Sequence, residues 1–449
     1  MKSTTDSAGF AHGVHPPMHK EDTAGEPIRQ FPFAPVMVVP LSQHIGKPAI
    51  PVVREGQEVV RGQCLARPDG DLSIAMHAPA SGVVQRIDLV PGIAGRMVPG
   101  IYLKPFPGST QEVAEGRPCP LDSASPDEIL SAIQHAGIVG LGGAAFPTHV
   151  KLRIPEDQPV DALIINGVEC EPYLTTDHRV MLEQRDDVFT DIRYLLKATG
   201  ATRAIIGLEA NKIEVADALL ERMPQDMPVE VSVMPVKYPQ GAEKMLISAL
   251  LGREVPSGAL PLAVGAVVVN VATTAEIGRL LPHGQGIQER VITITGPAVH
   301  KRGNYRIPIG TPLRFALEYV GVEDDIGQVF LGGPMMGQSL PSLDIPITKG
   351  TSGFVAFRRD QSLRTRAEYP CINCGYCVDA CPLFLNPARL GLLSLNQRFD
   401  EMAEQHHLMD CFECGSCAYV CPAHIPLVQR FRGAKSFLRK QAQQDQDKP

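Results

Sequence analysis

The chain has 449 residues, of which 44% are hydrophobic and 20% charged, so the composition predicts a folded globular protein of roughly three or four domains. A formal net charge of −7 excludes a general nucleic-acid binder. Trp is absent and aromatic content is only 5%, which leaves no stacking platform for single-stranded nucleic acid.

The opening segment is polar and rich in His, Pro and Gly, which predicts a loosely ordered, flexible arm over residues 1–30. It contains no apolar core of signal-peptide type. His12, His15 and His19 carry metal-binding side chains, but their uneven spacing beside Pro16-Pro17 favours a loop over a metal site.

Residues 31–108 consist of short β-runs punctuated by Gly and Pro. The phrases EGQEVVRGQ and APASGVVQRI resemble the lipoyl/biotinyl barrel-sandwich fold. That fold carries its prosthetic group on a lysine, for which the segment IAMHAP offers no counterpart. We therefore expect a barrel-sandwich-like N-terminal domain with a structural role.

Residues 125–285 alternate strands such as DALIING and GAVVVNVA with helical stretches such as SPDEILSAIQHAG, which predicts an α/β domain with a largely parallel sheet. Residues 286–350 switch to RVITITG, YRIPIGTP and a short helix, and we expect a β-grasp-like (SLBB) module there. After a linker at 358–369, residues 365–435 form the cysteine-bearing region, and the charged tail 436–449 is expected to fray.

The longest apolar stretch, Ala259 to Ala272, is interrupted by Pro261 and Gly265 and is too short to span a bilayer. Any association with a membrane is therefore expected to require partner proteins.

The α/β domain contains a candidate phosphate cradle in the sequence GLGGAAFP, from Gly140 to Pro147, followed by Lys151. Glycines allow backbone N–H groups to approach a phosphate, and Pro147 suits the first turn of a following helix. The sequence is not GxGxxG, so an ordinary Rossmann dinucleotide site is not indicated. Taken alone, the pattern is also typical of a plain glycine-rich turn.

Eight of the eleven cysteines fall into two runs of the form CxxCxxCxxxCP, a spacing typical of [4Fe-4S] ligation. In two-cluster ferredoxins the fourth Cys of each run serves the other cluster, so we expect one cluster on Cys371, Cys374, Cys377 and Cys421 and a second on Cys411, Cys414, Cys417 and Cys381. Two zinc sites or a disulfide knot are the alternatives, and both are disfavoured by two complete copies ending in Cys-Pro.

Clusters pass single electrons whereas metabolic hydride donors deliver two, so a cluster-bearing chain often also carries a flavin. Cluster thiolates persist best in a reducing compartment, which favours the cytosol. The remaining cysteines, Cys64, Cys119 and Cys170, are scattered and have no evident pairing.

The segment GLGGAAFPTHVKL resembles the flavin loop of the NADH-oxidising, FMN-bearing subunit of respiratory complex I, and NGVECEP, KYPQGAEK and VNVATT resemble further motifs of that protein. Carried over by position, the resemblance implies an FMN site made of Gly140, Gly142, Gly143, Lys151, Asn166, Glu169, Tyr238, Gly241, Asn270 and Thr273. By the same resemblance, Phe146, Lys151, Glu171 and Glu243 would lie near NADH.

Four positions depart from that family. Leu141, Val168, Ala242 and Val269 stand where the complex I protein commonly has Arg, Asp, Glu and Asn. The resemblance therefore implies fewer polar contacts to the flavin in this chain.

The order of the parts, from barrel sandwich through FMN domain and GGPMMG module to the double cysteine run, resembles the RnfC/RsxC family of the Rnf electron-transport complex over about residues 10 to 435. The resemblance implies a peripheral protein on the cytoplasmic face of the inner membrane, exchanging electrons between NADH and ferredoxin through FMN and two [4Fe-4S] clusters. Its implied partners are the membrane subunits and the ferredoxin-like subunit of that complex, which moves ions. The direction of electron flow and the ion are left open.

Two alternatives remain at this point. One is a cobalamin reductase of the propanediol-utilisation type, which shares the flavin loop and double cysteine run, and the other is a non-catalytic docking subunit that keeps clusters but not nucleotide.

Several other residues have a plainer interpretation beside a chemical one. Contact with flavin or nicotinamide is expected of Glu169 and Glu171 in preference to acid–base catalysis, since hydride transfer needs no general base. Cys170 is expected to act as a small buried hydrophobe more readily than as a redox thiol. Asp177 and His178 are expected to cap a helix or lie at the surface.

A basic stretch follows the second cysteine run. It could dock on acidic lipid or on a partner protein, and a solvated helix face is the commoner outcome. It comprises Arg430, Arg432, Lys435, Arg439 and Lys440.

Overall fold

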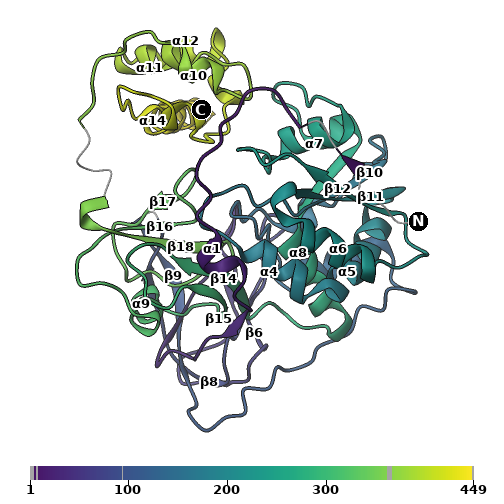
Figure 1. Cartoon of the computed structure of the whole chain (residues 1–449). Coiled ribbons are helices and arrows are strands. Elements are labelled where there is room, and N and C mark those ends of the chain that lie inside the picture. Colours follow the sequence, from purple (N-terminus) through teal and green to yellow (C-terminus); the bar gives the residue numbers. More distant parts are fainter. Residues whose placement is uncertain (1–4, 7–8, 94, 362–366, 447–449) are drawn as a thin grey trace.

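The computed structural model describes residues 5–6, 9–93, 95–361 and 367–446. Two β-rich parts and a parallel α/β domain form the body, and a helical part that carries the cysteine runs lies above the body in the view of Figure 1. Parts of the expected arm, linker and tail (residues 1–4, 7–8, 362–366 and 447–449) lie outside the described residues.

The N-terminal β-domain is a sandwich of two small sheets, as its Gly-punctuated β-runs predict. Its four-stranded sheet has the order β3-β9-β8-β5, and its three-stranded sheet the order β4-β6-β7. The strands are β3 (Met37–Pro40), β4 (Ile50–Pro51), β5 (Glu58–Val59), β6 (Cys64–Arg67), β7 (Met76–His77), β8 (Gly82–Pro91) and β9 (Met97–Pro105).

The α/β domain is built on a parallel sheet of order β1-β12-β11-β10-β13. Its strands are β1 (Thr5–Asp6), β10 (Ala162–Asn166), β11 (Arg203–Glu209), β12 (Val229–Met234) and β13 (Ala266–Asn270). Its helices are α2 (Pro126–His135), α3 (Thr148–Lys151), α4 (Thr176–Glu183), α5 (Arg185–Thr199), α6 (Ile213–Arg222), α7 (Glu243–Leu251) and α8 (Val271–Leu280).

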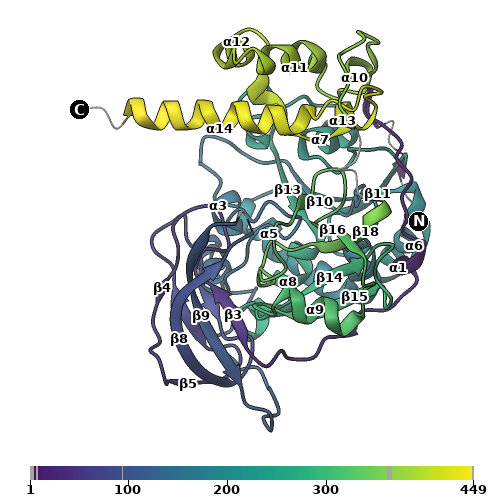
Figure 2. The same cartoon turned by 90° about the vertical axis from the view of Figure 1, so that its left-hand side faces the viewer.

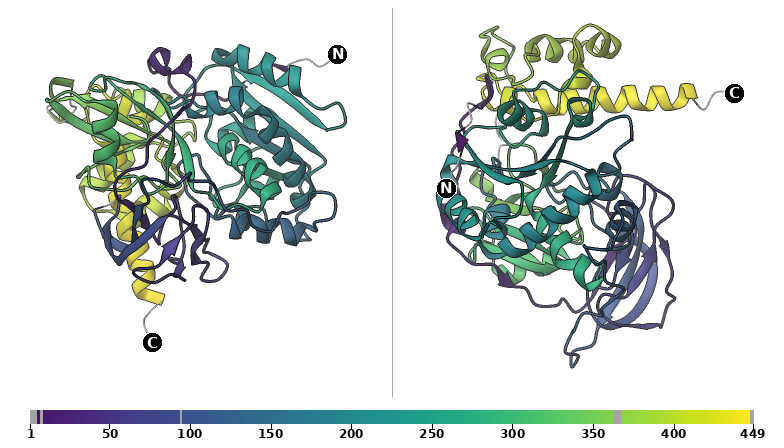
Figure 3. Two further views of the ribbon diagram at one scale, coloured as in Figure 1. Left: turned by 90° about the horizontal axis from the view of Figure 1, so that it is seen from below. Right: turned by 90° about the vertical axis from the view of Figure 1, so that its right-hand side faces the viewer.

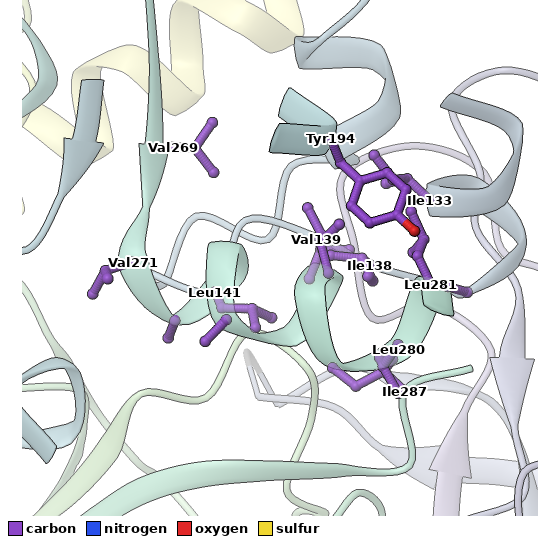
Figure 4. Packing of buried hydrophobic residues seen from close by; sticks show 14 of the residues in the cluster. Ile133, Ile138, Val139, Leu141, Tyr194, Val269, Val271, Leu280, Leu281 and Ile287 are labelled. Carbon is purple, nitrogen blue, oxygen red and sulfur yellow. The ribbon is translucent and has the colours of Figure 1, made fainter. Parts of the chain in front are cut away.

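Local signals explain how these elements begin and pack. Ser125 and Glu128 form a capping box at the start of α2. Helix α8 packs closely on α5 at Gly278, where an added Cβ would meet the carbonyl oxygen of Asp187 at 1.9 Å. Figure 4 shows the resulting core, in which Val139 lies near Tyr194 of α5 and Leu141 of the glycine loop lies beside α8.

The next module is a six-stranded mixed sheet of order β17-β16-β18-β14-β15-β2 beside helix α9 (Leu313–Val320). Its strands are β2 (Arg29–Gln30), β14 (Glu289–Thr295), β15 (Gly303–Pro308), β16 (Ile326–Leu331), β17 (Gln338–Ser339) and β18 (Gly353–Arg358). The sheet thus extends past the expected boundary at residue 350, because β18 pairs with β14 and β16, and it also recruits β2 from the arm.

The cysteine region is helical, as predicted, and its helices include α10 (Tyr376–Asp379), α11 (Pro387–Leu395), α12 (Phe399–Glu404), α13 (Ser416–Tyr419) and α14 (Leu427–Gln446). Figures 2 and 3 show α14 projecting well beyond the rest of this domain. The tail expected to fray therefore continues the helix as far as Gln446.

The arm also differs from its expectation of loose order. From residue 9 onward it follows the surface of the body, includes helix α1 (Glu21–Ala24), and exchanges two backbone hydrogen bonds between Val14 and Tyr238. Low hydrophobicity predicts disorder only when a segment finds no partners, and here the partners, such as Tyr238 for Val14 and Tyr173 for Met18, lie far along the chain. His12 hydrogen-bonds to the carbonyl of Asp379, whereas His19 stacks on Tyr173, so these two histidines have separate partners.

Candidate functional site

The site begins where the strand order of the parallel sheet reverses. β10 connects onward to β11 on one side and lies beside β13 on the other, so the carboxyl ends of β10 and β13 form a topological switch point. Asn166 and Asn270 are the last residues of these two strands and lie in register with each other. Ligands of open α/β sheets bind at this kind of position.

Each asparagine organises one neighbouring segment. The Asn166 amide donates to the carbonyl of Gly241 at 2.9 Å, which holds the KYPQGAEK turn against β10. The Asn270 side chain caps α8 by accepting from the N–H groups of Ala272 (3.0 Å) and Thr273 (3.2 Å). Two motifs that are distant in sequence therefore meet at one sheet edge.

The glycine loop lies against this edge. Its two ends are joined where the Gly140 N–H donates to the Phe146 carbonyl at 2.8 Å, and the Leu141 N–H donates to the Thr273 hydroxyl at 2.9 Å. Gly143 has φ +107°, and an added Cβ there would meet no atom within 4 Å. The loop is thus fixed at its ends and leaves open space over Gly143, which suits the close approach of a phosphate or flavin.

A cation lies beside the loop. Lys151, the last residue of α3, forms an ion pair with Glu243 at the start of α7, and both side chains are about a third exposed. The ion pair brings together Lys151 and Glu243, which the resemblance places near the nucleotide.

Charged groups beneath the sheet edge form a buried network. The Glu169 carboxylate accepts from the N–H of Asp177 at 3.0 Å, and Lys20 of the arm donates to the Glu169 carbonyl at 2.6 Å. Asp177 accepts from the Asn270 amide at 2.7 Å. Burial, followed by the nearby Glu169, raises the pKa of Asp177 to about 7.

Lys20 and Asp177 were not expected at the site. Asp177 was expected to be a capping or surface residue, yet it is half-buried in the first turn of α4 and its carboxyl accepts from the Asn270 amide, while His178 is buried. Lys20 has no local signal, since only the path of the arm brings it to Glu169.

Glu171 joins the α/β domain to the GGPMMG segment. Its carboxylate accepts from the N–H groups of Met335 (2.6 Å) and Met336 (3.1 Å). Burial raises the pKa of Glu171, although these two donors act in the opposite direction. Its neighbour Cys170 accepts weakly from the Gly241 N–H at 3.4 Å, and burial raises the pKa of its thiol, which suppresses the reactive thiolate.

Tyr238 connects the sheet edge to the cysteine region. Its ring is buried, and its hydroxyl donates to the backbone carbonyl of Cys414 at 2.5 Å. Tyr238, Val14 and Ala380 form a small apolar cluster, with Met335 and Cys414 packed against it. The α/β domain therefore makes direct contact with the second cysteine run.

The thiols of the second run lie together with the last cysteine of the first. Burial, with further contributions from Cys414 and Cys381, raises the pKa of Cys411 to about 11. Burial and then Cys414, Cys411 and Cys381 raise the pKa of Cys417, with a smaller contribution from Cys377.

In the first run, Cys377 has one neighbour from its own run and one from the second run: burial and then Cys374 and Cys421 raise its pKa. For Cys411 and Cys377 the neighbour from the other run is the one that the ferredoxin rule assigns, and for Cys417 the assigned neighbour Cys381 acts more strongly than Cys377. Within the described ranges, no three His, Cys, Asp or Glu side chains close around a single metal ion. The eight thiols of the two runs supply the donor chemistry that two [4Fe-4S] clusters require.

The residues at the sheet edge also fit FMN, since an open glycine turn, a cation and two strand-end amides meet at a switch point. The departures from the complex I pattern have a physical basis. Leu141, Val168 and Val269 are buried in the cores on either side of the sheet, and Ala242 directly precedes α7. The side chains of Leu141, Val168 and Val269 therefore pack in the cores beside the site.

Comparisons with known proteins agree with this architecture. A model of the RnfC barrel sandwich hybrid domain matches residues 8–105, one of the Nuo51 FMN-binding domain matches 133–279, and one of a 4Fe-4S dicluster domain matches 370–425. A crystal structure of an NAD+-reducing [NiFe]-hydrogenase in the H2-reduced state is similar in fold, with a TM-score of 0.50 and 21% identity over 73% of this chain and 69% of that one. No described helix has the length and apolarity needed to cross a bilayer.

Curated relatives match nearly the full length. One relative belongs to the proton-translocating ferredoxin:NAD(+) oxidoreductase complex of Clostridium ljungdahlii and is 41% identical, with 98% of this chain and 96% of the relative aligned. Its counterpart in the Na(+)-translocating complex of Acetobacterium woodii is 40% identical, with 95% and 96% aligned. These similarities show that the chain belongs to the RnfC family of the ion-translocating ferredoxin:NAD(+) oxidoreductase complexes.

Proposed function

We propose that this chain exchanges electrons between NADH and the partner subunits of an ion-translocating ferredoxin:NAD+ oxidoreductase, through FMN and two [4Fe-4S] clusters. The observation that carries the proposal is the contact between Tyr238 and Cys414, at 2.5 Å from hydroxyl to carbonyl oxygen. The contact supports the proposal because it joins Cys414, a proposed cluster ligand, to the turn beside the sheet edge where we propose the flavin. Family membership supports the same activity.

When bound, FMN converts two-electron hydride exchange into single-electron steps, and the clusters carry electrons singly. The chain's own residues hold and shield these groups. The backbone of Gly140, Gly142 and Gly143 would approach the flavin phosphate, and Lys151 would offset its charge in exchange for Glu243. Asn166, Glu169, Tyr238, Gly241, Asn270 and Thr273 would complete the surroundings of the flavin.

Phe146 and Glu171 are assigned to the nicotinamide side. Phe146 is half-buried at the end of the glycine loop, and Glu171 is held by the Met335 and Met336 backbone. Neither residue needs to move a proton, because a hydride carries its own electrons to the acceptor. Their role is therefore to orient the nucleotide and exclude water.

We assign Cys371, Cys374, Cys377 and Cys421 to one cluster and Cys411, Cys414, Cys417 and Cys381 to the other. The neighbour groups among the thiols support this crossed arrangement. The cluster on the second run is then the one adjacent to the α/β domain.

The partners proposed are the membrane subunits and the ferredoxin-like subunit of the complex, with ferredoxin reached indirectly. The chain would be held at the cytoplasmic face of the membrane by these subunits, in keeping with relatives that are named as subunits of ion-translocating complexes.

The FMN assignment can be tested by titrating purified protein with FMN and comparing Lys151→Gln with wild type. Loss of a charge-assisted contact worth about 1.5–3 kcal/mol should weaken FMN binding by at least about tenfold. Lys104→Gln, at an exposed position on β9, is the matched control and should leave the affinity unchanged. Equal affinity in all three proteins would remove Lys151 from the site, and no FMN binding in wild type would refute the proposal.

A further inference from the structure

The two cysteine runs are internal copies of one motif, yet they differ in how much protein covers them. Cys371 and Cys374 of the first run are exposed, whereas Cys411 and Cys414 at the same positions of the second run are half-buried. The residue before the third cysteine of each run differs as well. Tyr376, before Cys377, is 57% exposed, whereas Ser416, before Cys417, is fully buried.

The rest of the chain accounts for the cover over the second run. The Cys414 carbonyl accepts from Tyr238, and a Cβ on Gly415 would meet the Met335 carbonyl oxygen at 2.7 Å. Glu413 pairs with Arg432 (2.9 Å) and Lys435 (3.1 Å) of α14. Three basic residues of the stretch after this run are thus paired inside the chain, because Arg430 also pairs with Glu368.

The first run contacts the body at its end, where Ala380 packs on Tyr238 and Val14, and it also carries exposed apolar side chains. We call the set of Tyr369, Ile372, Tyr376, Phe384 and Tyr419 the first-run rim; each of its members is at least half exposed. Helix α10, which starts at Tyr376, packs against α13, which ends at Tyr419, and the Tyr369 N–H donates to the Ala423 carbonyl just beyond Cys421 at 2.9 Å. The rim residues thus come from the segments that carry the first run and Cys421.

We infer that the first-run rim is the docking surface for a partner protein that carries its own one-electron centre. The inference rests on the proposed function, because an electron that enters at the covered second run must leave where the other cluster meets solvent. Transient electron-transfer partners bind through small surfaces, under about 1,200 Å². Five exposed apolar side chains beside the exposed Cys371 and Cys374 suit a contact of that kind.

A membrane is the less suitable occupant of this surface. Anionic lipid attracts clusters of Lys and Arg, whereas residues 367–388, which carry four of the five rim residues, contain no Lys or Arg and include the exposed Asp379. The arm contacts the rim, since the His12 ring packs edge-on against the Phe384 ring with ring centroids 4.6 Å apart.

The test is the double variant Ile372→Gln/Tyr376→Gln, whose uncharged side chains leave the field at the cluster nearly unchanged. The matched control is Leu395→Gln at the end of α11, in the same domain and with 61% exposure against 68% for Ile372. Binding to the detergent-solubilised membrane subunits is measured for both, together with electron exchange between clusters and NAD(H) in the isolated proteins. Sedimentation with protein-free phosphatidylglycerol vesicles is measured in parallel.

We expect the double variant to bind the membrane subunits at least about tenfold more weakly, and the control to change by less than about twofold. Internal electron exchange should be the same in all three proteins. Equal binding by the double variant, or equal weakening by Leu395→Gln, would overturn the inference. If wild type sediments with the vesicles and the double variant does not, the rim is a membrane-binding surface and the inference is overturned. If wild type shows no electron exchange between its clusters and NAD(H), the proposed function is refuted. The binding comparison would still decide whether the rim is a docking surface.

Discussion

Asp177 offers a stability test of the site's buried network. Its carboxyl accepts from the amide of Asn270, the last residue of β13, at 2.7 Å, and burial and then Glu169 raise its pKa to about 7. In the unfolded chain an aspartate titrates near its ordinary value of about 3.9. Between these two values the folded protein binds a proton that the unfolded chain has released.

The free energy of unfolding therefore falls as pH rises from about 4 to about 7, and stays lowered at higher pH. A shift of roughly three pKa units, at about 1.4 kcal/mol per unit, corresponds to a cost of about 4 kcal/mol at pH 8. Asp177→Asn removes this cost and keeps an oxygen that can accept from Asn270. We expect the variant to be more stable than wild type by about 2–4 kcal/mol at pH 8, and by much less at pH 5.

The assay is thermal unfolding of anaerobically prepared protein at both pH values. If the α/β domain unfolds as a unit, the melting temperature should rise on the order of 5 °C or more at pH 8. Asp186→Asn is the matched control, since this exposed aspartate has a pKa lowered by its hydrogen bonds to Arg222 and should give a small change of the opposite sign. Equal melting temperatures for Asp177→Asn and wild type at pH 8, or a change independent of pH, would refute the reasoning.

Three further outcomes are expected. Lys20→Met should lower the free energy of unfolding by about 3 kcal/mol in a denaturant titration, because it removes a buried ammonium that donates to the Glu169 and Leu174 carbonyls; an unchanged midpoint would mean that the arm is not anchored there. Tyr238→Phe leaves the Cys414 carbonyl without its donor, at about 1–2 kcal/mol, and should speed amide hydrogen exchange around Cys414; unaltered exchange would contradict the contact. If the runs share ligands as proposed, combining Cys381→Ser with Cys411→Ser should retain about four irons per chain, whereas combining it with Cys371→Ser should retain almost none, and the reverse result would exclude the crossed arrangement.

Much of the architecture could be predicted from local signals. The cysteine spacing predicts the cluster domain, and alternating strands and helices predict the parallel sheet because both patterns repeat within short windows. The resemblance supplied the flavin residues, of which Asn166, Asn270 and Thr273 do meet the glycine loop or its neighbouring turn at one sheet edge. That those residues bind FMN remains a proposal.

What could not be predicted depends on contacts between distant segments. The arm becomes ordered because Lys20 and Val14 find partners at Glu169 and Tyr238, and no local pattern records that path. Strand β18 completes a sheet whose other strands precede it, which explains why the module extends past residue 350. Asp177 looked like a helix cap because its burial comes from a neighbouring strand.

The most direct test of the relay is the transfer of electrons from the clusters to NAD+ in the isolated chain. Anaerobic protein carrying FMN and both clusters is reduced with dithionite, freed of excess reductant and mixed with NAD+, while NADH absorbance and the cluster paramagnetic resonance signals are recorded. We predict that both cluster signals decay as NADH appears, one NADH for every two electrons lost, and that protein prepared without FMN shows neither change. Clusters that stay reduced in the FMN-loaded protein at excess NAD+ would contradict the relay.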